Sequence, residues 1–309
     1  MQKEDKKIKR VGILRGGAGK HYESSLKKGG DIISHIFENL SDKYKTVDIF
    51  IDKNGNWHAN GLPVILADLV RKVDVVWNTS EHPGLSVTLD NFSIPNIGKG
   101  HFLKALENNN DMLKKHMKDI GVQMPRSIVL PLYQKDFDGS RERYAIKKAK
   151  EIFEKFSAPW IVKSFTEDKN MAIHLAKTFS ELVNAIADGV AHQKSILIEE
   201  FISGKVASVH SIQKFRGEDI YVFPPKNLIN SEKEKIITLV KELHKHLGIK
   251  HYLKSDFILH PKRGFFLNGI NSSPDFKEGS DFYHSCEFVG VKMHHVIEHI
   301  LNEALNSRT

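Results

Sequence analysis

Residues 254–275 read KSDFILHPKRGFFLNGINSSPD, in which two short apolar runs lie on either side of a Pro/Gly turn. These runs, 257–259 and 265–270, predict an antiparallel hairpin. Asp256 precedes the first run and Asn271 ends the second, so a hairpin would bring their side-chain oxygens close together. Hard oxygen ligands of this kind suit Mg2+, which also binds waters and substrate phosphates. The two residues could equally be ordinary strand-end and turn residues, and other segments have to decide between these interpretations.

The composition indicates a soluble globular protein. The chain has 309 residues, of which 40% are apolar and 27% charged, and its length predicts two or three structural units. We expect a cytoplasmic protein that does not contact the membrane, because no apolar run is long enough to span one and the Lys-rich N-terminus has no signal-peptide core. The single cysteine, Cys286, excludes an internal disulfide and a cysteine-based metal site.

The net charge of +8 leaves two interpretations open. Nucleic-acid binding is one, but the lysines are spread along helical stretches beside acidic residues and are not interleaved with aromatic residues. A solvated basic surface that also attracts an anionic nucleotide explains the charge more economically. We therefore expect no nucleic-acid partner.

The first hundred residues alternate strands and helices, as in a small α/β domain. A strand at 8–14, a glycine-rich turn at 15–20 and a helix at 23–39 form the first unit of a doubly wound sheet. The turn could present backbone N–H groups to an anion at the helix N-terminus, or could simply be a tight turn. Glu81 follows a further strand at 73–77, where open sheets bind ligands, although a solvated loop acid is an equal alternative.

After residue 101 the pattern changes to α+β. The predicted helices span 101–124, 141–156 and 180–190, and the predicted strands span 159–163, 195–199 and 206–213. Lys163 ends an apolar strand, so its ammonium group should reach a cleft where phosphate would be the counter-ion. Glu199 and Glu200 end a neighbouring strand, and the apolar residues 201 and 202 follow. This combination suits an adenine ring, or else marks a strand that ends in two solvated acids.

The C-terminal third contains two further predicted helices. Residues 231–247 have an apolar face at helical spacing, and Ser231 followed by Glu234 predicts a capping box at the helix start. A last helix at about 290–305 should close the core.

In this order, the segments resemble the D-alanine:D-alanine ligases of the ATP-grasp superfamily along nearly the whole chain. The matching stretches are GILRGG at 12–17, ESSL at 23–26, IPNIG at 94–98, IVK at 161–163, ILIEEFISG at 196–204, SD at 255–256 and NSSP at 271–274. The resemblance implies a mixed α/β and α+β fold. A small doubly wound domain at 1–100 would precede an ATP-grasp domain at 101–309, whose two antiparallel-sheet lobes would span about 125–204 and 205–309.

The resemblance also implies an activity. The family phosphorylates the carboxylate of one D-alanine with ATP, and the amine of a second D-alanine attacks the acyl phosphate to form a dipeptide for peptidoglycan synthesis. ATP, Mg2+, an amino-acid substrate and a homodimer are therefore implied. By correspondence, Lys163 would contact the α- and β-phosphates, and Glu199 would hold adenine together with the backbone of Glu200, Phe201 and Ile202. Asp256 and Asn271 would bind Mg2+, and Ser280 would bind the acceptor carboxylate.

The sequence departs from the family pattern at several of its functional positions. Gly269 replaces a metal-bridging glutamate, and Met112 replaces a phosphate-binding lysine. His21 replaces the acid that holds the substrate amine. Glu23 and Ser25 remain near that acid's position.

Other departures change the charge or the loops around the phosphates. Lys254 replaces an arginine, which keeps the charge but not the planar bidentate contact. Val206 replaces the ribose-binding acid, the loop at 168–172 lacks glycine, and a long mobile loop is reduced to 223–226, where Lys226 stands in for its lysine. The alternative to an active ligase is thus a catalytically impaired ATP-grasp protein that binds a nucleotide or small ligand without ligation.

Overall fold

The structure is a computed structural model that describes residues 8–17, 19, 21–80, 84–98, 100–165 and 171–306. Lys20, Glu81 and residues 168–170, which the sequence analysis named, lie outside this described part. The chain forms two compact units. The first unit contains residues 1–121, 207–257 and 269–309, and the second contains residues 122–206 and 258–268. The division expected from the sequence, at residues 100 and 204, stays a prediction.

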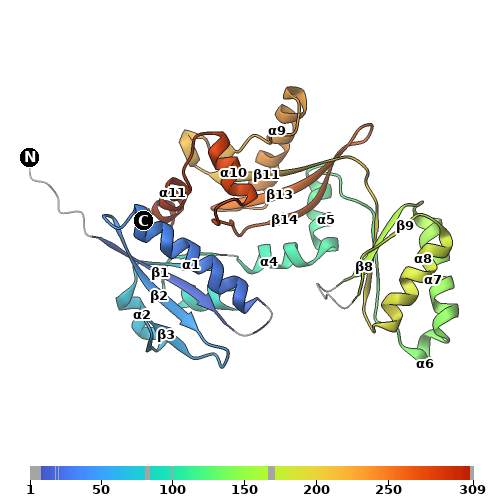
Figure 1. The fold of residues 1–309 in the computed structure, drawn as a ribbon, viewed down its shortest axis with the longest axis horizontal. Helices are drawn as coiled ribbons and strands as arrows, with labels where there is room; N and C mark the ends of the chain where they lie inside the picture. The colour runs from blue at the N-terminus through green and yellow to red at the C-terminus, as the bar shows by residue number, and fades with distance from the viewer. Residues whose placement is uncertain are drawn as a thin grey trace, which may run out of the picture. The chain divides into compact units, whose positions relative to one another are not determined.

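A six-stranded sheet forms one part of the first unit (Figure 1). Its order is β4-β3-β2-β1-β5-β6, where β1 (Lys9–Gly16), β2 (Tyr44–Ile51), β5 (Val75–Asn78) and β6 (Asn96–Ile97) are parallel. The edge strands β3 (Trp57–Ala59) and β4 (Leu62–Pro63) are antiparallel. Three helices accompany this sheet: α1 (Tyr22–Asn39), α2 (Leu66–Lys72) and α3 (Leu85–Asn91).

Both faces of this sheet are buried. Ile13 of β1 packs into a core with Ile32 of α1, whereas the next residue, Leu14, packs into a separate core with Leu69 of α2 and Leu89 of α3. Successive residues of a strand point to opposite faces, so the hydrophobic run in β1 supplies both cores. This arrangement confirms the doubly wound N-terminal sheet that the sequence predicts.

The second sheet has four strands in the order β12-β11-β13-β14. These are β11 (Lys205–Gln213), β12 (Ile220–Val222), β13 (Tyr252–His260) and β14 (Gly264–Asn271), and a short 3-10 helix, η1 (Phe215–Gly217), lies between β11 and β12. The helices of this part are α4 (His101–Asn108), α5 (Asn110–Asp119), α9 (Asn230–His246), α10 (Asp281–Phe288) and α11 (Met293–Asn306). The last helix closes the core, as expected: Val296 and Ile300 of α11 pack with the residues of α1 and β1.

The third sheet belongs to the second unit and is antiparallel, in the order β7-β10-β8-β9. Its elements are β7 (Ser127–Leu130), α6 (Lys135–Asp138), α7 (Arg141–Lys155), β8 (Trp160–Ser164), β9 (His174–Ala176), α8 (Phe179–Ala191) and β10 (Ile196–Glu200). Figure 1 shows α7 and α8 side by side against this sheet, where Ile152 and Ile186 share a core with Trp160. An α/β sheet followed by two antiparallel sheets is the fold class that the sequence predicts.

Two local predictions are wrong, and a third is confirmed with different bounds. The predicted helix at 101–124 is two helices, because the Asn109 side chain accepts a hydrogen bond from the Met112 amide and starts α5. The predicted capping box of Ser231 and Glu234 does not form: α9 begins at Asn230, and Glu232 accepts from the Ile229 amide at 3.0 Å instead. The hairpin is confirmed but longer than expected, since β13 begins at Tyr252 and Asp256 therefore lies within the strand.

Among the described helices, none combines the length and hydrophobicity that a transmembrane helix requires.

Candidate functional site

A cluster of charged side chains surrounds Lys254 in the first unit. Lys254 Nζ lies 3.4 Å from Asp256 Oδ1 and 3.7 Å from Asp281 Oδ2. Lys254 and Asp256 are two residues apart on β13, so they project from the same face of the sheet. The Ser208 hydroxyl of the adjacent strand β11 donates to Asp256 Oδ1 at 2.5 Å. The sheet therefore holds a carboxylate and an ammonium group in fixed positions beside the start of α10.

Ser280 is the N-cap residue of α10 and lies directly before Asp281. Its Oγ accepts from the Tyr283 amide at 3.1 Å and donates to the Asp275 carbonyl at 2.9 Å. The structure thus brings three of the predicted residues, Lys254, Asp256 and Ser280, into one neighbourhood. A ligand carboxylate at Ser280 would have to replace Asp275 as the acceptor of its hydroxyl proton.

Asn271 is the last residue of β14 and is exposed. Its Oδ1 accepts from the Ser273 amide at 2.8 Å, which forms an Asx turn at the strand end. Glu107 of α4 holds the next residue of this turn, since its Oε1 accepts from the Ser272 amide at 2.6 Å and from the Ser272 hydroxyl at 2.7 Å. Sequence reasoning missed Glu107, because the two residues are 165 positions apart and no local pattern connects them.

A second residue that the sequence did not single out is His210 of β11. Its Nδ1 lies 2.7 Å from the Tyr252 hydroxyl, and its ring packs against Phe282. Burial, assisted by the positive charge of Lys254, lowers the pKa of His210 to about 3. Because His210 and Ser208 are two residues apart on β11, a neutral imidazole lies on the sheet face that carries Asp256.

In the second unit, Lys163 and Glu199 form an ion pair across the neighbouring strands β8 and β10. Lys163 Nζ lies 2.6 Å from Glu199 Oε2. The Glu199 side chain is 13% exposed and that of Lys163 is 37% exposed, so the ammonium group can be reached by solvent. A cation and a carboxylate thus lie where the sequence predicts nucleotide contacts.

The carboxylate of Glu200 is used inside the protein. Arg126 Nε donates to Glu200 Oε2 at 2.9 Å, and Arg263 donates to Oε1 at 2.6 Å. The amides of Glu200 and Phe201 already donate to Arg126 and Pro159 carbonyls. Among residues 200–202, an amide donor to an adenine nitrogen would therefore have to come from Ile202. The Phe201 side chain is exposed, and Ile202 is buried.

The remaining predicted site residues lie in the first unit. Glu23 is exposed in the first turn of α1. Ser25 is buried, and its Oγ accepts from the Gly16 amide at 3.0 Å. The Gly17 amide donates to the Ile51 carbonyl at 2.8 Å, so two amides of the glycine turn are engaged within the protein and do not face an anion. Lys226 is exposed, with its Nζ 5.3 Å from the centre of the Phe288 ring.

A cavity of about 310 Å³ opens in the first unit at the carboxyl ends of β5 and β6. Its lining includes Asn78, Thr79, His251, Ser272 and Ser273. None of the predicted site residues within the described chain lines this cavity, which is therefore separate from the Lys254 cluster. The charged groups of that cluster indicate the functional site more strongly than the cavity does.

Comparison with known proteins identifies relatives for this arrangement. The protein-family model described as D-ala D-ala ligase C-terminus matches residues 207–302. A D-alanine–D-alanine ligase from Geotalea uraniireducens is 24% identical over 98% of this chain and 98% of its own length, and one from Carboxydothermus hydrogenoformans is 22% identical over 97% and 99%.

Solved structures agree with the sequence relatives. The D-alanyl-alanine synthetase A from Vibrio cholerae superposes with a TM-score of 0.76 at 18% identity, over 96% of this chain and 98% of that one. The VanG D-Ala:D-Ser ligase from Enterococcus faecalis superposes with a TM-score of 0.75 at 18% identity, over 96% of this chain and 100% of that one. The chain is similar to the D-alanine:D-alanine ligases over nearly its whole length. The predicted resemblance and the ATP-grasp fold are thus confirmed, whereas the individual site residues stay predictions.

Three departures from the D-alanine:D-alanine ligase pattern leave the backbone around them intact. An added Cβ at Gly269 would meet no described heavy atom within 4 Å, so a side chain has room there. The Met112 amide satisfies the cap of α5, and the His21 carbonyl accepts from the Ser25 amide. The missing functional groups could therefore be restored one at a time.

Proposed function

We propose that this protein is an ATP-dependent carboxylate–amine ligase that joins D-alanine to a second amino acid, as a step of peptidoglycan precursor synthesis. The observation that supports this proposal most is the cluster of Lys254, Asp256 and Ser280. It places an ammonium group, a carboxylate and a hydroxyl at one end of an antiparallel sheet. This combination suits a reaction in which a phosphate group, a metal ion and a second carboxylate have to be held together.

The residue types at Asp256 and Asn271 suit Mg2+. Both side chains are at least partly exposed, and Mg2+ prefers one or two carboxylate or amide oxygens together with waters and substrate phosphates. Within the protein, Asp256 Oδ1 and Asn271 Oδ1 accept hydrogen bonds from Ser208 and Ser273, which a metal ion would share or replace. When bound there, Mg2+ would neutralise phosphate charge. With Gly269 in place of a glutamate, this site has one carboxylate fewer than the family's, so we expect weak binding of the metal.

The reaction would proceed in two steps. The γ-phosphoryl group of ATP passes to a carboxylate oxygen of the first amino acid, which gives an acyl phosphate and ADP. The amine of the second amino acid then attacks the acyl carbon: the C–N bond forms, the C–O bond to phosphate breaks, and the amine releases a proton to solvent. Lys163 would hold ATP phosphates, Lys254 would offset the charge of the acyl phosphate, and Ser280 would hold the acceptor carboxylate.

The test is phosphate release from Mg-ATP by the purified protein, with and without D-alanine, D-serine and L-alanine. We expect release that depends on a D-amino acid and that Asp256→Asn reduces by about 100-fold, as removal of one charge-stabilising group does in other enzymes. The matched control is Asp68→Asn, which changes an exposed aspartate in the first turn of α2 and should leave release unchanged. Equal release by wild type and Asp256→Asn would contradict the assignment of the metal site.

Gly269 and Met112 favour one alternative, a protein that binds nucleotide without ligation. Under that alternative, calorimetry detects Mg-ATP binding that Lys163→Ala weakens, yet no amino acid of the panel triggers phosphate release. A homodimer, also implied by the resemblance, is tested by light scattering of the eluted protein.

A further inference from the structure

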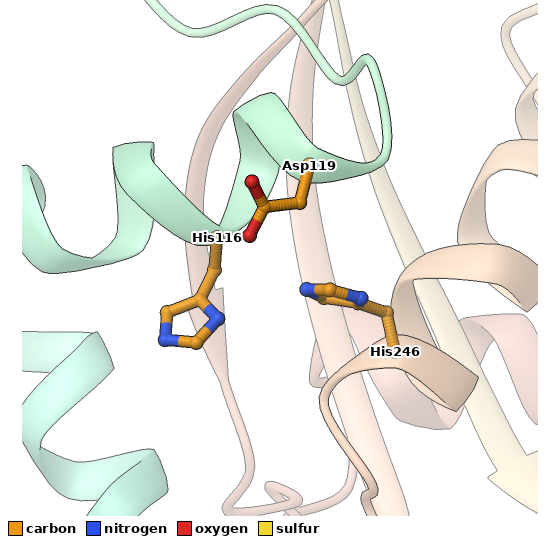
Figure 2. Close-up of side chains that lie close together, drawn as sticks. All are labelled: His116, Asp119 and His246. Carbon is orange, nitrogen blue, oxygen red and sulfur yellow. The ribbon is translucent and has the colours of Figure 1, made fainter.

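A group of metal-ligating side chains lies outside the proposed ligase site, at His116, Asp119 and His246 (Figure 2). One ligand atom from each of the three side chains lies within 4.8 Å of the other two. His116 is half-buried, whereas Asp119 and His246 are exposed. Figure 2 shows the carboxylate of Asp119 directed into the space between the two imidazoles.

The secondary structure holds these side chains in place. His116 and Asp119 are three residues apart on α5 and therefore lie on one face of the helix. His246 is the last residue of α9. The His116 and His246 rings meet edge to face, with 5.8 Å between their centres, and the centre of the Phe102 ring of α4 lies 5.2 Å from that of His116.

The three side chains converge without bonding to one another. In the part of the chain that the structure describes, neither imidazole nor the carboxylate has a hydrogen-bond or ion-pair partner. The chain offers a comparison in the second unit, where His174 Nε2 lies 2.7 Å from Asp188 Oδ2, and His192 Nδ1 lies 3.1 Å from Asp188 Oδ1 and 2.9 Å from the Asp188 carbonyl oxygen. That trio has the same composition, but its two rings already contact Asp188. The trio in Figure 2 leaves its ligand atoms available.

We propose that His116, Asp119 and His246 form a binding site for a borderline transition-metal ion, with Zn2+ as its best fit. Two imidazole nitrogens and one carboxylate oxygen suit Zn2+, whereas Mg2+ and Ca2+ require oxygen ligands. Ligands of one tetrahedral Zn2+ lie about 3.4 Å apart for bonds of about 2.0–2.1 Å. Rotation of the exposed side chains of Asp119 and His246 would bring the three atoms to that separation. The fourth position faces solvent and would carry water.

The charge around this site opposes a cation but does not prevent its binding. Lys115, Lys118 and Lys245 are sequence neighbours of the three ligands. Exposed charges of this kind are screened over about 8 Å at physiological ionic strength, while the ligand bonds act at direct contact. The metal would join α5 to α9 and so stabilise α5. This helix ends at Asp119, two residues before Gly121, where the first stretch of the first unit ends.

The experiment is a Zn2+ titration by calorimetry of the full chain without an affinity tag, after treatment with a chelator and in excess Mg2+. We expect one equivalent to bind and to raise the thermal unfolding temperature. His116→Ala, His246→Ala and Asp119→Asn should each weaken binding at least about 10- to 100-fold, since the loss of mere outer-shell partners already has an effect of this size. Circular dichroism without metal checks that each variant is folded.

Two controls separate this site from the other metal ligands of the chain. His192→Ala removes one ring of the second His–Asp–His trio and should leave Zn2+ binding intact, as should Asp256→Asn in the proposed Mg2+ site. Loss of the binding in either control, unchanged binding in His116→Ala or His246→Ala, or no binding by the wild type would each overturn the proposal. The ligase assay plays no part in this test, so its outcome is independent of the proposed function.

Discussion

Gly269 is the position at which a substitution could add the missing carboxylate to the proposed metal site. It lies on β14, two residues before Asn271, and an added Cβ there has no described neighbour within 4 Å. We predict that Gly269→Glu supplies the missing carboxylate and lowers the Mg2+ concentration for half-maximal phosphate release by about tenfold, which corresponds to about 1.4 kcal/mol. The measurement is a Mg2+ titration of phosphate release at saturating ATP and D-alanine.

Gly269→Ala is the matched control, because it adds the Cβ without the carboxylate and should leave the Mg2+ dependence as in the wild type. The same loss of Mg2+ affinity in both variants would mean that the position tolerates no side chain. Identical titrations of Gly269→Glu and wild type would remove the position from the metal site.

The side chain of Glu200 contributes to stability through its charge. Burial opposes its ionisation, but hydrogen bonds from Arg126 and Arg263 outweigh burial and lower the pKa of the Glu200 carboxyl from 4.5 to about 2. The resulting stabilisation is present above pH 4.5 and is lost as the pH falls toward 2. We predict that Glu200→Gln lowers the free energy of unfolding at pH 7 by about 1–3 kcal/mol, a range that allows for salt screening of two half-exposed arginines.

Urea unfolding at a series of pH values between 7 and 3 measures this effect. The gap between wild type and Glu200→Gln should narrow below pH 4.5, because the unfolded wild type then takes up a proton at Glu200 that the folded protein does not bind until the pH approaches 2. Glu218→Gln serves as the control, since Glu218 pairs with Lys241 at 2.7 Å but both side chains are more than 40% exposed. A gap that stays constant down to pH 3 would contradict the ionic origin of the stabilisation.

At the scale of elements, the β13–β14 hairpin contains residues of both units. Residues 252–257 and 269–271 belong to the first unit, and the tip at 258–268 belongs to the second. Within the second unit, the tip is held by the Arg263–Glu200 pair and by close contact with Gly204. An added Cβ at Gly204 would lie 2.1 Å from the Leu259 carbonyl oxygen, so the backbone itself requires a glycine there.

We predict that Gly204→Ala displaces the hairpin tip and destabilises the protein by about 1–3 kcal/mol, the usual cost of overpacking. Thermal unfolding followed by circular dichroism measures the loss. Gly30→Ala in α1 is the counterpart, because an added Cβ there meets no described atom and alanine is favoured over glycine inside a helix by about 0.5–1 kcal/mol. Equal stability of Gly204→Ala and the wild type would show that the contact is not rigid.

For the whole molecule, the sequence predicted local elements better than the contacts between them. The periodicity placed α7 and α8 within a residue of their observed ends, because a buried helix face repeats within a few residues. It could not reveal that Ser208 binds Asp256 or that Glu107 binds Ser272, since these partners are 48 and 165 positions apart. The candidate site was therefore assigned by the order of motifs along the chain, while the hydrogen bonds that orient its side chains came from the fold.

Each unit contains predicted nucleotide or metal contacts: Lys163 and Glu199 belong to the second unit, and Asp256 and Asn271 belong to the first. We predict that Mg-ATP slows amide hydrogen exchange in both units, at 161–164 and 196–202 as well as at 252–257 and 271–274, because a ligand stabilises the segments that bind it. In Asp256→Asn, the protection should persist in the second unit and fall in the first. Unchanged exchange at these segments in the wild type, or equal protection by Mg2+ alone, would contradict the predicted nucleotide contacts.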